Sequence, residues 1–321
     1  MAKTIVGVFR GGPSSEYDVS LRSGAEVLGA LDERRYEAVD IFIDKTGVWH
    51  MHGVPAAPQK VCNAIDIAFN ALHGEYGEDG KIQQIFEQYG LSYTGSGIIA
   101  SAAGMHKRTA RDLFGQAGLT IPAGIAVLKN SDWAEASAYA IRHLGFPLIV
   151  KPANRGSSIG IRVATNAYEL MDAMKTAFST DNEIVIEQFI RGREASVAVL
   201  ERFRGIPHYA FPVVEIVPPP SSPFFDAASK YDGRTQEICP GRFSDDIRDR
   251  LQATAVAAHS AIGCRHYSRS DFMITPKGEI VILELNTLPG LTGQSLYPKA
   301  AASVGLNFPQ FVHHLISLAR R

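Results

Sequence analysis

The most informative segment of the sequence is VKPANRGSSIGI, residues 150–161 of the 321-residue chain. Lys151 ends a short apolar run, and a loop rich in glycine and serine leads from it into the alternating segment 161–164. One interpretation is a flap whose backbone N–H groups and hydroxyls hold a phosphate chain, with Lys151 as the counter-charge. The other is the nucleophile elbow of a hydrolase, because residues 156–160 also fit G-x-S-x-G.

The residues on either side of the loop favour the flap. A hydrolase elbow needs a buried strand that runs directly into the serine and a helix that begins directly after it. Here Pro152 and residues 153–155 separate the apolar run from Gly156, and the pattern after Gly160 has a period of two. This strand–loop–strand context predicts a phosphate flap, with a plain hairpin turn as the remaining alternative.

Composition indicates an ordinary globular chain with a local binding site. Apolar residues make up 45% and charged residues 20%, and the formal net charge is −1, so no extended surface for nucleic acid is expected. The apolar runs are much shorter than a membrane span, and the N-terminus resembles a strand rather than a signal peptide. The three cysteines are widely spaced without a CxxC pair, which favours neither a zinc site nor a disulfide framework and fits a reducing cytoplasm.

The N-terminal part of the chain alternates between strand and helix patterns. The expected strands cover residues 4–10, 38–44, 64–70 and 91–94, and the expected helices cover residues 19–31 and 81–89. This order predicts an α/β domain with a parallel sheet covered by helices. Residues 11–12 and 73–80 each follow a predicted strand, so both are candidate binding loops at the carboxyl ends of strands.

The rest of the chain predicts two further units of mixed α and β structure, at residues 101–185 and 186–321. The expected strands cover residues 148–151, 161–164, 183–189, 195–201 and 280–285, and the expected helices cover residues 107–117, 132–144 and 245–262. Residues 217–240 show little periodicity, and a loop of that length is usually a lid or a binding loop.

A predicted hairpin near the C-terminus carries a cluster of polar side chains. Arg269 and Asp271 share one face of its first strand, because side chains alternate along a strand. Residues 275–278 have the composition of a turn. Glu284 and Asn286 then share one face of the returning strand.

The register of this hairpin determines whether its acids can share an ion. If Ile274 pairs with Glu279, Asp271 lies opposite Ile282 and diagonal to Glu284, a backbone separation of about 7–8 Å. Hard oxygen ligands with an amide suit Mg²⁺, which proteins usually hold with a few carboxylates and substrate phosphates. The alternative is a solvated face with an Arg–Glu pair across the strands, but the returning strand is continuously apolar before Glu284, and acids beside buried strands need partners.

Other residues could meet the phosphates and the base of a nucleotide. Lys107 and Lys151 could each contact phosphate oxygens as point charges. The backbone of residues 187–190, at the end of a strand-like run, could bind an adenine edge. Together with the flap and the paired carboxylates, these residues predict a magnesium–nucleotide site for phosphoryl transfer, which fits a kinase as well as a ligase.

Short motifs recur along the whole chain in a specific order. They are GGPSSE at 11–16, VSL at 19–21, LHG at 72–74, GEDG at 77–80, YTGS at 93–96, KP at 151–152, GSSIG at 156–160, KY at 230–231, Arg269 with Asp271, and ELNTLPGLT at 284–292. Each motif alone is modest, but in this joint order and spacing the chain resembles the D-alanine–D-alanine ligases, a family of the ATP-grasp superfamily.

The resemblance implies both a fold and an activity. The fold would be an N-terminal Rossmann-like domain, residues 1–100, followed by a two-lobed ATP-grasp domain, residues 101–321, with a central ATP-binding lobe at 101–185 and a catalytic lobe at 186–321. The activity would be ATP-dependent joining of two D-alanines through an acyl phosphate, which supplies a peptidoglycan precursor. A small-molecule phosphotransferase, or a ligase that makes D-alanyl-D-lactate or uses D-serine, is the alternative.

The resemblance also implies roles for residues in all three units. Two Mg²⁺ or Mn²⁺ ions would be held by Asp271, Glu284 and Asn286. The catalytic residues would be Glu16, Ser157, Tyr231, Arg269, Gly290 and Ser295. The residues that bind D-alanine would be Glu16, His73, Arg269, Ser295 and Leu296. The residues that bind ATP would be Lys107, Lys151, Ser157, Ser158, Glu187, Gln188, Ile190, Glu194 and Lys230.

Three of these residues would form a latch. By the same resemblance, Glu16, Ser157 and Tyr231 would share hydrogen bonds that tie the N-terminal domain to the flap and the long loop, and closure would exclude water. Tyr231 indicates an amine acceptor, because related ligases that make D-alanyl-D-lactate lack a tyrosine there. The family further implies a cytoplasmic homodimer that binds ATP and D-alanine and contacts neither nucleic acid nor membrane.

Overall fold

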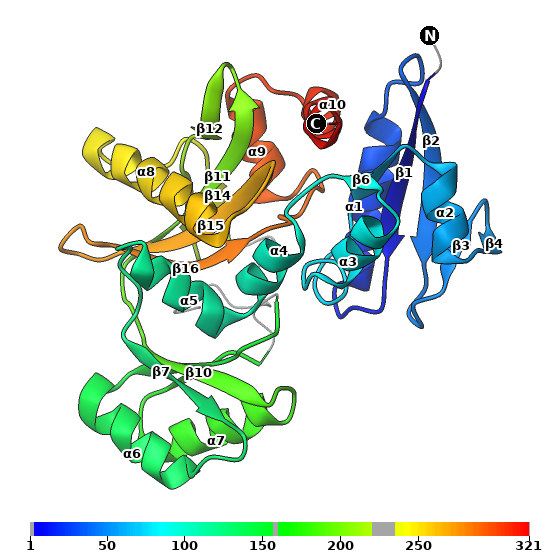
Figure 1. Cartoon of the computed structure of the whole chain (residues 1–321). Coiled ribbons are helices and arrows are strands. Elements are labelled where there is room, and N and C mark those ends of the chain that lie inside the picture. Colours follow the sequence, from blue (N-terminus) through cyan, green and yellow to red (C-terminus); the bar gives the residue numbers. More distant parts are fainter. Residues whose placement is uncertain (1–2, 157–159, 220–234, 321) are drawn as a thin grey trace.

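The computed structural model describes residues 3–156, 160–219 and 235–320 and contains three β-sheets with helices around them (Figure 1). The strands of the three sheets come in turn from residues 4–93, 124–188 and 193–286. The strands of each sheet therefore come from one consecutive part of the chain. We call the three sheets, each with the helices that pack on it, the first, second and third units. In Figure 1 the first sheet lies at the right, the second at the bottom and the third at the upper left. The domain boundaries expected at residues 100 and 185 stay a prediction.

The first sheet is parallel at its centre. Its strands are β1 Thr4–Gly11, β2 Tyr36–Ile43, β3 Trp49–Met51, β4 Val54–Pro55, β5 Ile67–Asn70 and β6 Ser92–Tyr93, and its helices are α1 Tyr17–Ala30, α2 Pro58–Ala64 and α3 Lys81–Gln88. In the order β4-β3-β2-β1-β5-β6, the last four strands are parallel, as predicted, while β3 and β4 form an antiparallel edge that was not predicted. α1 packs closely on β1 because Gly24 has no side chain, and a Cβ there would stand 2.5 Å from the Cβ of Arg10.

The second sheet carries the flap. It is formed by β7 Gly124–Leu128, β8 Leu148–Pro152, β9 Arg162–Ala164 and β10 Glu183–Gln188, with helices α6 Trp133–Leu144 and α7 Ala167–Phe178. All its pairs are antiparallel, in the order β7-β10-β8-β9. A strand, β9, follows the glycine–serine loop where an elbow would need a helix, so the strand–loop–strand prediction is confirmed.

The third sheet has six strands in the part of the chain that the structure describes. Its strands are β11 Arg193–Phe203, β12 Ile206–Ala210, β13 Val214–Val217, β14 Gln236–Ile238, β15 Tyr267–Ile274 and β16 Ile280–Asn286, and the helices near it are α4 Ile98–Met105, α5 Lys107–Gln116, α8 Asp245–Ile262, α9 Leu296–Ser303 and α10 Phe308–Ala319. The order is β14-β13-β11-β15-β16, and β12 pairs with β11. α8 packs on β11, β12 and β15, while α4 and α5 pack against β16.

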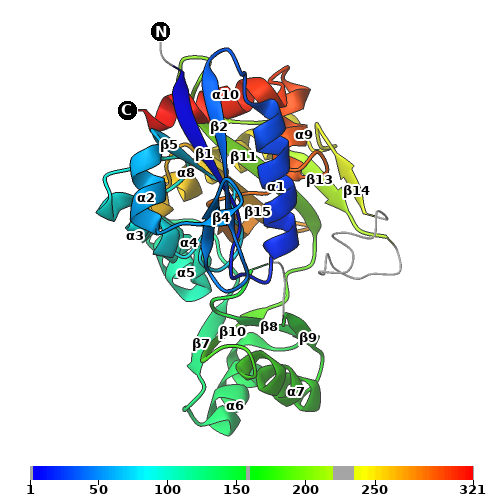
Figure 2. The same cartoon turned by 90° about the vertical axis from the view of Figure 1, so that its right-hand side faces the viewer.

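One hydrophobic core joins the first and third sheets. It contains Val6 and Phe69 from the first sheet together with Tyr267, Tyr297 and Phe311 from β15, α9 and α10. α10 contacts α1, β5 and β6, and Figures 1 and 2 show it beside both sheets. Burial of aromatic side chains contributes about 1.5–3 kcal/mol each, so this shared core fixes the two units relative to each other.

The predicted elements are present with shifted ends. The helix expected at 245–262 has those bounds in α8. The strand expected at 64–70 begins only at Ile67, because Ala64 still belongs to α2.

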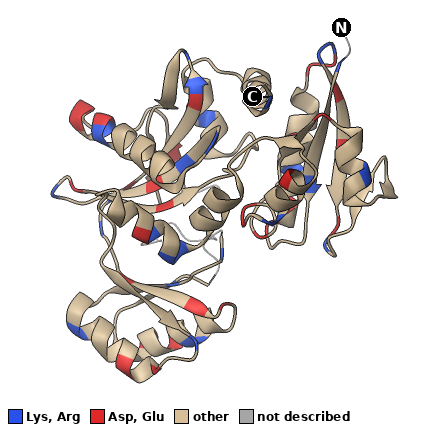
Figure 3. Cartoon of the chain, in the orientation of Figure 1, with Lys and Arg blue, Asp and Glu red and all other residues tan. Residues whose placement is uncertain are grey.

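Lysine, arginine and acidic residues are interspersed in all three units (Figure 3). Within the described parts of the chain, no helix has the length and apolar character that crossing a bilayer requires.

His266 connects the first and third units just before β15. Its Nδ1 accepts the backbone N–H of Gly95 at 3.0 Å, and the residue is buried. Burial, together with the positive charge of Arg265, lowers the pKa of His266 to about 4. Its backbone φ of +66° lies in the left-handed region, where asparagine is one of the better tolerated residues.

We expect the protein to lose stability in acid through His266. Its pKa is about 4 when folded and about 6.5 in the unfolded chain. The unfolded state therefore binds more protons between these values, and the free energy of unfolding should fall by about 3 kcal/mol as the pH drops through this window. His266→Asn keeps an acceptor for Gly95 without titrating, so it should reduce this slope. Urea unfolding at several pH values measures the effect, and equal slopes in both proteins would contradict it.

Candidate active site

A cleft of about 1180 Å³ lies between the first and third units. Its walls come from α1, the loop after β5, the paired strands β15 and β16, and residues 288–296. Pockets for a single small ligand usually measure about 300–1,000 Å³. The cleft therefore has room for more than one small substrate.

The cleft is lined by all the residues for which substrate or metal roles were predicted, and also by Gly290. Those that line it are Glu16, His73, Arg269, Asp271, Glu284, Asn286, Gly290, Ser295 and Leu296. They come from both ends of the chain, and the docking of the first unit on the third brings them to one place. Their positions are observed here, whereas their individual roles stay predictions.

The register of the acidic hairpin differs from the prediction. Ile274 pairs with Ile280, one residue beyond the expected partner, and a bulge follows before Asp271 is reached. As a result Asp271 lies directly opposite Glu284, not opposite Ile282. A bulge inserts an extra residue into one strand and redirects the side chains beyond it. The expected diagonal arrangement is thus wrong, and the two acids are closer neighbours than predicted.

Asp271 is held by three side chains. Its carboxylate accepts hydrogen bonds from Arg269 Nε at 3.0 Å and Nη2 at 2.8 Å, and from Ser196 Oγ at 2.6 Å. Asn286 Nδ2 lies 3.5 Å from Oδ2. The expected alternative of an Arg–Glu pair across the strands is therefore wrong, because Arg269 forms its ion pair with Asp271 on its own strand.

Arg269 is a permanently charged group inside the cleft. Burial acts to lower the pKa of its guanidinium, but the charge and hydrogen bonds of Asp271, with further help from Glu284 and Glu78, hold that pKa above its ordinary value. A largely buried cation that faces the cleft can stabilise negative charge that develops on a substrate.

The acids and amide of the hairpin fit a hard divalent cation. Asp271 and Glu284 are directly opposed across β15 and β16, a position in which the Cβ atoms are about 4.5–5.5 Å apart. Asn286 is paired with Arg269 in the ladder and adds an amide oxygen beside them. Two carboxylates and one amide form a donor set of the kind that Mg²⁺ or Mn²⁺ prefers.

Glu16 and His73 are the predicted site residues in the part of the cleft that belongs to the first unit. Glu16 directly precedes α1. His73 is buried, with its Nε2 2.8 Å from Ser23 Oγ and its Nδ1 3.1 Å from the carbonyl oxygen of Leu288. A Cβ on Gly156 would stand 2.7 Å from Oε1 of Glu16. The start of the glycine–serine loop therefore reaches the Glu16 carboxylate.

Ionic contacts hold the start of the flap. Arg155 forms an ion pair with Glu75 of the first unit, and Lys107 Nζ donates to the carbonyl oxygen of Arg155. Glu75 also accepts from the hydroxyls of Ser14 and Ser15, at 3.3 Å and 3.2 Å. A separate small cavity of about 40 Å³ is lined by Lys107, Arg155, Gly156, Glu284 and Asn286, among others. The predicted phosphate lysine Lys107 thus lies beside the predicted metal ligands.

Lys151 and Glu187 form a buried ion pair within the second sheet. Lys151 Nζ lies 2.6 Å from Glu187 Oε2, and Arg111 binds the other carboxylate oxygen. Burial acts to raise the pKa of Glu187, but the charges of Lys151 and Arg111 outweigh it and lower that pKa. The other residues predicted to surround the base are near this pair in the chain: Gln188 ends β10, Ile190 follows it, and Glu194 lies in β11.

Four predicted site residues lie outside the described residues. They are Ser157 and Ser158 in the flap and Lys230 and Tyr231 in the long loop. The latch of Glu16, Ser157 and Tyr231 therefore stays a prediction, of which the structure describes Glu16.

Sequence reasoning missed several polar residues of the site. Ser196, which holds Asp271, sits opposite it in the ladder and is the one hydroxyl in the apolar run 195–200. That interruption was a usable signal. Arg111 and the Arg155–Glu75 pair gave none, because each contact joins segments that are distant in sequence.

Two family models match almost the whole chain. The model described as "D-ala D-ala ligase C-terminus" matches residues 113–317, and the one described as "D-ala D-ala ligase N-terminus" matches residues 5–58 and 50–96. The chain belongs to the D-alanine–D-alanine ligase family. It is accordingly a ligase with the ATP-grasp fold, as its motifs predicted.

Individual relatives match over most or all of their length. The D-alanine–D-alanine ligase of Geobacter sulfurreducens is 39% identical over 316 residues, which cover 98% of this chain and 93% of the relative. The crystal structure of VanG D-Ala:D-Ser ligase from Enterococcus faecalis matches with a TM-score of 0.86 at 31% identity, covering 99% of this chain and 100% of that one. The D-alanine–D-alanine ligase of Bacillus anthracis complexed with ATP matches with a TM-score of 0.82 at 29% identity, covering 99% and 98%.

Proposed function

We propose that this chain is an ATP-dependent ligase that joins two D-alanines into D-alanyl-D-alanine for peptidoglycan synthesis. One observation carries the proposal: Arg269 and Asp271 on β15 face Glu284 and Asn286 on β16 in a cleft whose other wall contains Glu16. Membership of the ligase family supports the same reaction.

The reaction consists of two transfers whose atoms balance. A carboxylate oxygen of the first D-alanine attacks the γ-phosphorus of ATP, and ADP leaves, which gives an acyl phosphate. The amine of the second D-alanine then attacks the acyl carbon and loses a proton. The tetrahedral intermediate collapses with cleavage of the carbon–oxygen bond, so that inorganic phosphate leaves and the peptide bond remains.

The metal ligands would be Asp271, Glu284 and Asn286, and we infer that they hold two Mg²⁺ or Mn²⁺ ions. Bound there, the ions would neutralise charge on the phosphate oxygens. Arg269 is positioned by its two hydrogen bonds to Asp271. It would stabilise the oxyanion of the tetrahedral intermediate together with the Gly290 N–H.

The substrates would bind along the same cleft. Glu16 would bind the ammonium group of the first D-alanine, and His73 would lie beside it. Ser295 and Leu296 would hold the carboxylate of the second. Ser295 occupies the N-cap position of α9, and Leu296 is the first residue of that helix. Backbone N–H groups at a helix N-terminus favour a carboxylate.

ATP would bind between the second and third units. Lys107 and Lys151 would hold its phosphates, with Ser157, Ser158 and Lys230 of the flap and the long loop. Adenine and ribose would be surrounded by Glu187, Gln188, Ile190 and Glu194. Lys107 supports this assignment, because it lies beside Glu284 and Asn286 in the small cavity.

An assay of ATP turnover tests the proposal. Phosphate release should require both Mg²⁺ and D-alanine, and mass spectrometry should detect the dipeptide. A stable phosphorylated compound in place of a dipeptide would favour the phosphotransferase, which the comparisons do not support. D-serine and D-lactate as competing acceptors test the variant ligases, and L-alanine serves as the control.

We also expect a homodimer, which analytical ultracentrifugation would detect.

A further inference from the structure

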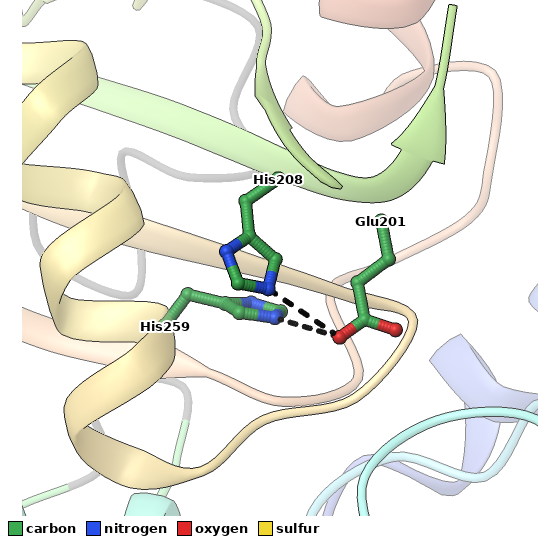
Figure 4. Close-up of side chains that lie close together, drawn as sticks. All are labelled: Glu201, His208 and His259. Atoms are coloured by element: carbon green, nitrogen blue, oxygen red, sulfur yellow. Dashed lines mark ion pairs between the residues drawn. The ribbon is translucent and has the colours of Figure 1, made fainter. Parts of the chain in front are cut away.

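Two histidines and a glutamate meet beside the third sheet, at positions that do not line the cleft. Glu201 lies near the end of β11, and His208 on β12 is its direct partner in the ladder. His259 comes from the last turn of α8, which packs on both strands. Figure 4 shows the two imidazole rings and the carboxylate converging from these three elements.

The spacing of the three groups is close to that of a metal site. Oε1 of Glu201 lies 3.6 Å from Nε2 of His259 and 3.8 Å from Nε2 of His208. All three ligand atoms lie within 4.8 Å of one another. Ligands of a tetrahedral zinc ion with bonds of about 2.0–2.1 Å stand about 3.3 Å apart. Small side-chain shifts would therefore bring all three atoms into coordination distance.

His259 gives the strongest support for a metal ion at this position. Its side chain is fully buried, and its Nδ1 lies 2.8 Å from Ser268 Oγ. Within the described residues, its buried Nε2 has no hydrogen-bond partner and faces the carboxylate of Glu201. In metal-binding histidines, the ring nitrogen that does not bind the metal typically makes a hydrogen bond, as Nδ1 does here with Ser268, and this bond fixes the ring and the tautomer. Buried polar atoms without a partner are costly and uncommon.

The charge balance favours a cation between these groups. Burial acts to raise the pKa of Glu201, but the neighbouring His259 and His266 outweigh this effect and hold that pKa at about 2. The carboxylate is therefore negative at neutral pH. The other charged or titratable groups that face the cluster are His266 and, more distantly, His314 and Arg265. Glu201 is the acid that a bound cation would neutralise.

We propose that Glu201, His208 and His259 bind a divalent transition metal ion of the zinc class. The two imidazoles distinguish this site from the oxygen ligands of the cleft, since imidazole suits zinc whereas carboxylate and carbonyl oxygens suit magnesium. Three protein ligands leave a fourth position for water. His208, whose side chain is 36% exposed, provides the entry path.

Such an ion would join the β11–β12 hairpin to α8. Its binding free energy would add to the stability of the folded state, because the unfolded chain does not hold these ligands together. The ion would not take part in ligation, since none of its three ligands lines the catalytic cleft.

Metal binding to the full-length protein tests the site. Metal-free protein is dialysed against Zn²⁺ with Mg²⁺ in excess, and the bound zinc is counted by mass spectrometry. We expect one zinc ion per chain at the histidine site and a higher thermal unfolding midpoint. His208→Ala and Glu201→Gln should each weaken zinc binding at least about tenfold. His143→Ala, at an exposed histidine on α6, is the matched control and should bind zinc like the original chain.

Two further measurements keep the outcome unambiguous. Co²⁺ in place of zinc should give the strong visible absorption of a four-coordinate site with imidazole ligands, and His208→Ala should remove it. Unchanged D-alanine-dependent ATP turnover in His208→Ala would show that this variant is folded and would separate the metal site from the ligase activity. Equal zinc affinity in His208→Ala and the original chain, or a cobalt spectrum of six oxygen ligands, would overturn the proposal.

Discussion

Replacing Glu284 with glutamine should lower D-alanine-dependent phosphate release by about 10³-fold, which corresponds to about 4 kcal/mol of transition-state stabilisation. Glu284 lies directly opposite Asp271 in the cleft. Glutamine keeps the size of the side chain but removes the negative charge that would hold a divalent ion. Initial rates of phosphate release at saturating ATP and D-alanine measure the effect.

The same hairpin offers a matched control for this variant. Glu279 is exposed and lies in the turn between β15 and β16, so Glu279→Gln makes the same chemical change away from the cleft and should leave the rate unchanged. A Glu284→Gln enzyme with more than half of the original rate would contradict the assignment of the metal site. Higher Mn²⁺ concentrations should partly restore the variant if a metal ligand has been weakened.

Replacing Arg269 should cost both activity and stability, in proportions that depend on the new residue. Arg269→Lys keeps a positive charge but loses the two parallel hydrogen bonds to Asp271. We expect the rate of ligation to fall by about 10²–10³-fold, the usual effect of losing an oxyanion donor. Arg269→Met also leaves Asp271 buried without its partner, which typically costs about 3–5 kcal/mol of stability.

Rates and unfolding curves together separate the two effects. Arg250→Lys, at an exposed arginine on α8 that pairs with Asp246, is the control and should change neither quantity. A smaller loss of stability in Arg269→Lys than in Arg269→Met, with a large loss of activity in both, would support Arg269 as an oxyanion group. Normal ligation by Arg269→Lys would exclude that role.

The sequence predicted both strands of the hairpin, β15 and β16, but not the register in which they pair. Alternation places Arg269 with Asp271 and Glu284 with Asn286 in any register, so the polar cluster could be found. The bulge beside Asp271 leaves no mark in the apolar pattern of β16, because that strand is apolar at consecutive positions. The direct opposition of Asp271 and Glu284 therefore became visible only in three dimensions.

The ion pairs show a second limit of sequence reasoning. Lys151 could be identified as a cation next to a phosphate flap, yet its partner Glu187 lies on another strand and shares its carboxylate with Arg111 on α5. Nothing local in the sequence specifies such a three-residue contact. The cluster of Glu201, His208 and His259 is similar, because His259 lies on α8, which is distant in sequence from β11 and β12.

In the proposed reaction, the cleft joins two D-alanines through an acyl phosphate. The most direct measurement uses D-alanine with ¹⁸O in both carboxylate oxygens and follows the label by mass spectrometry. We predict one ¹⁸O atom in each inorganic phosphate that is released and one in the peptide carbonyl of D-alanyl-D-alanine. Unlabelled phosphate, or labelled phosphate without any dipeptide, would contradict the claim.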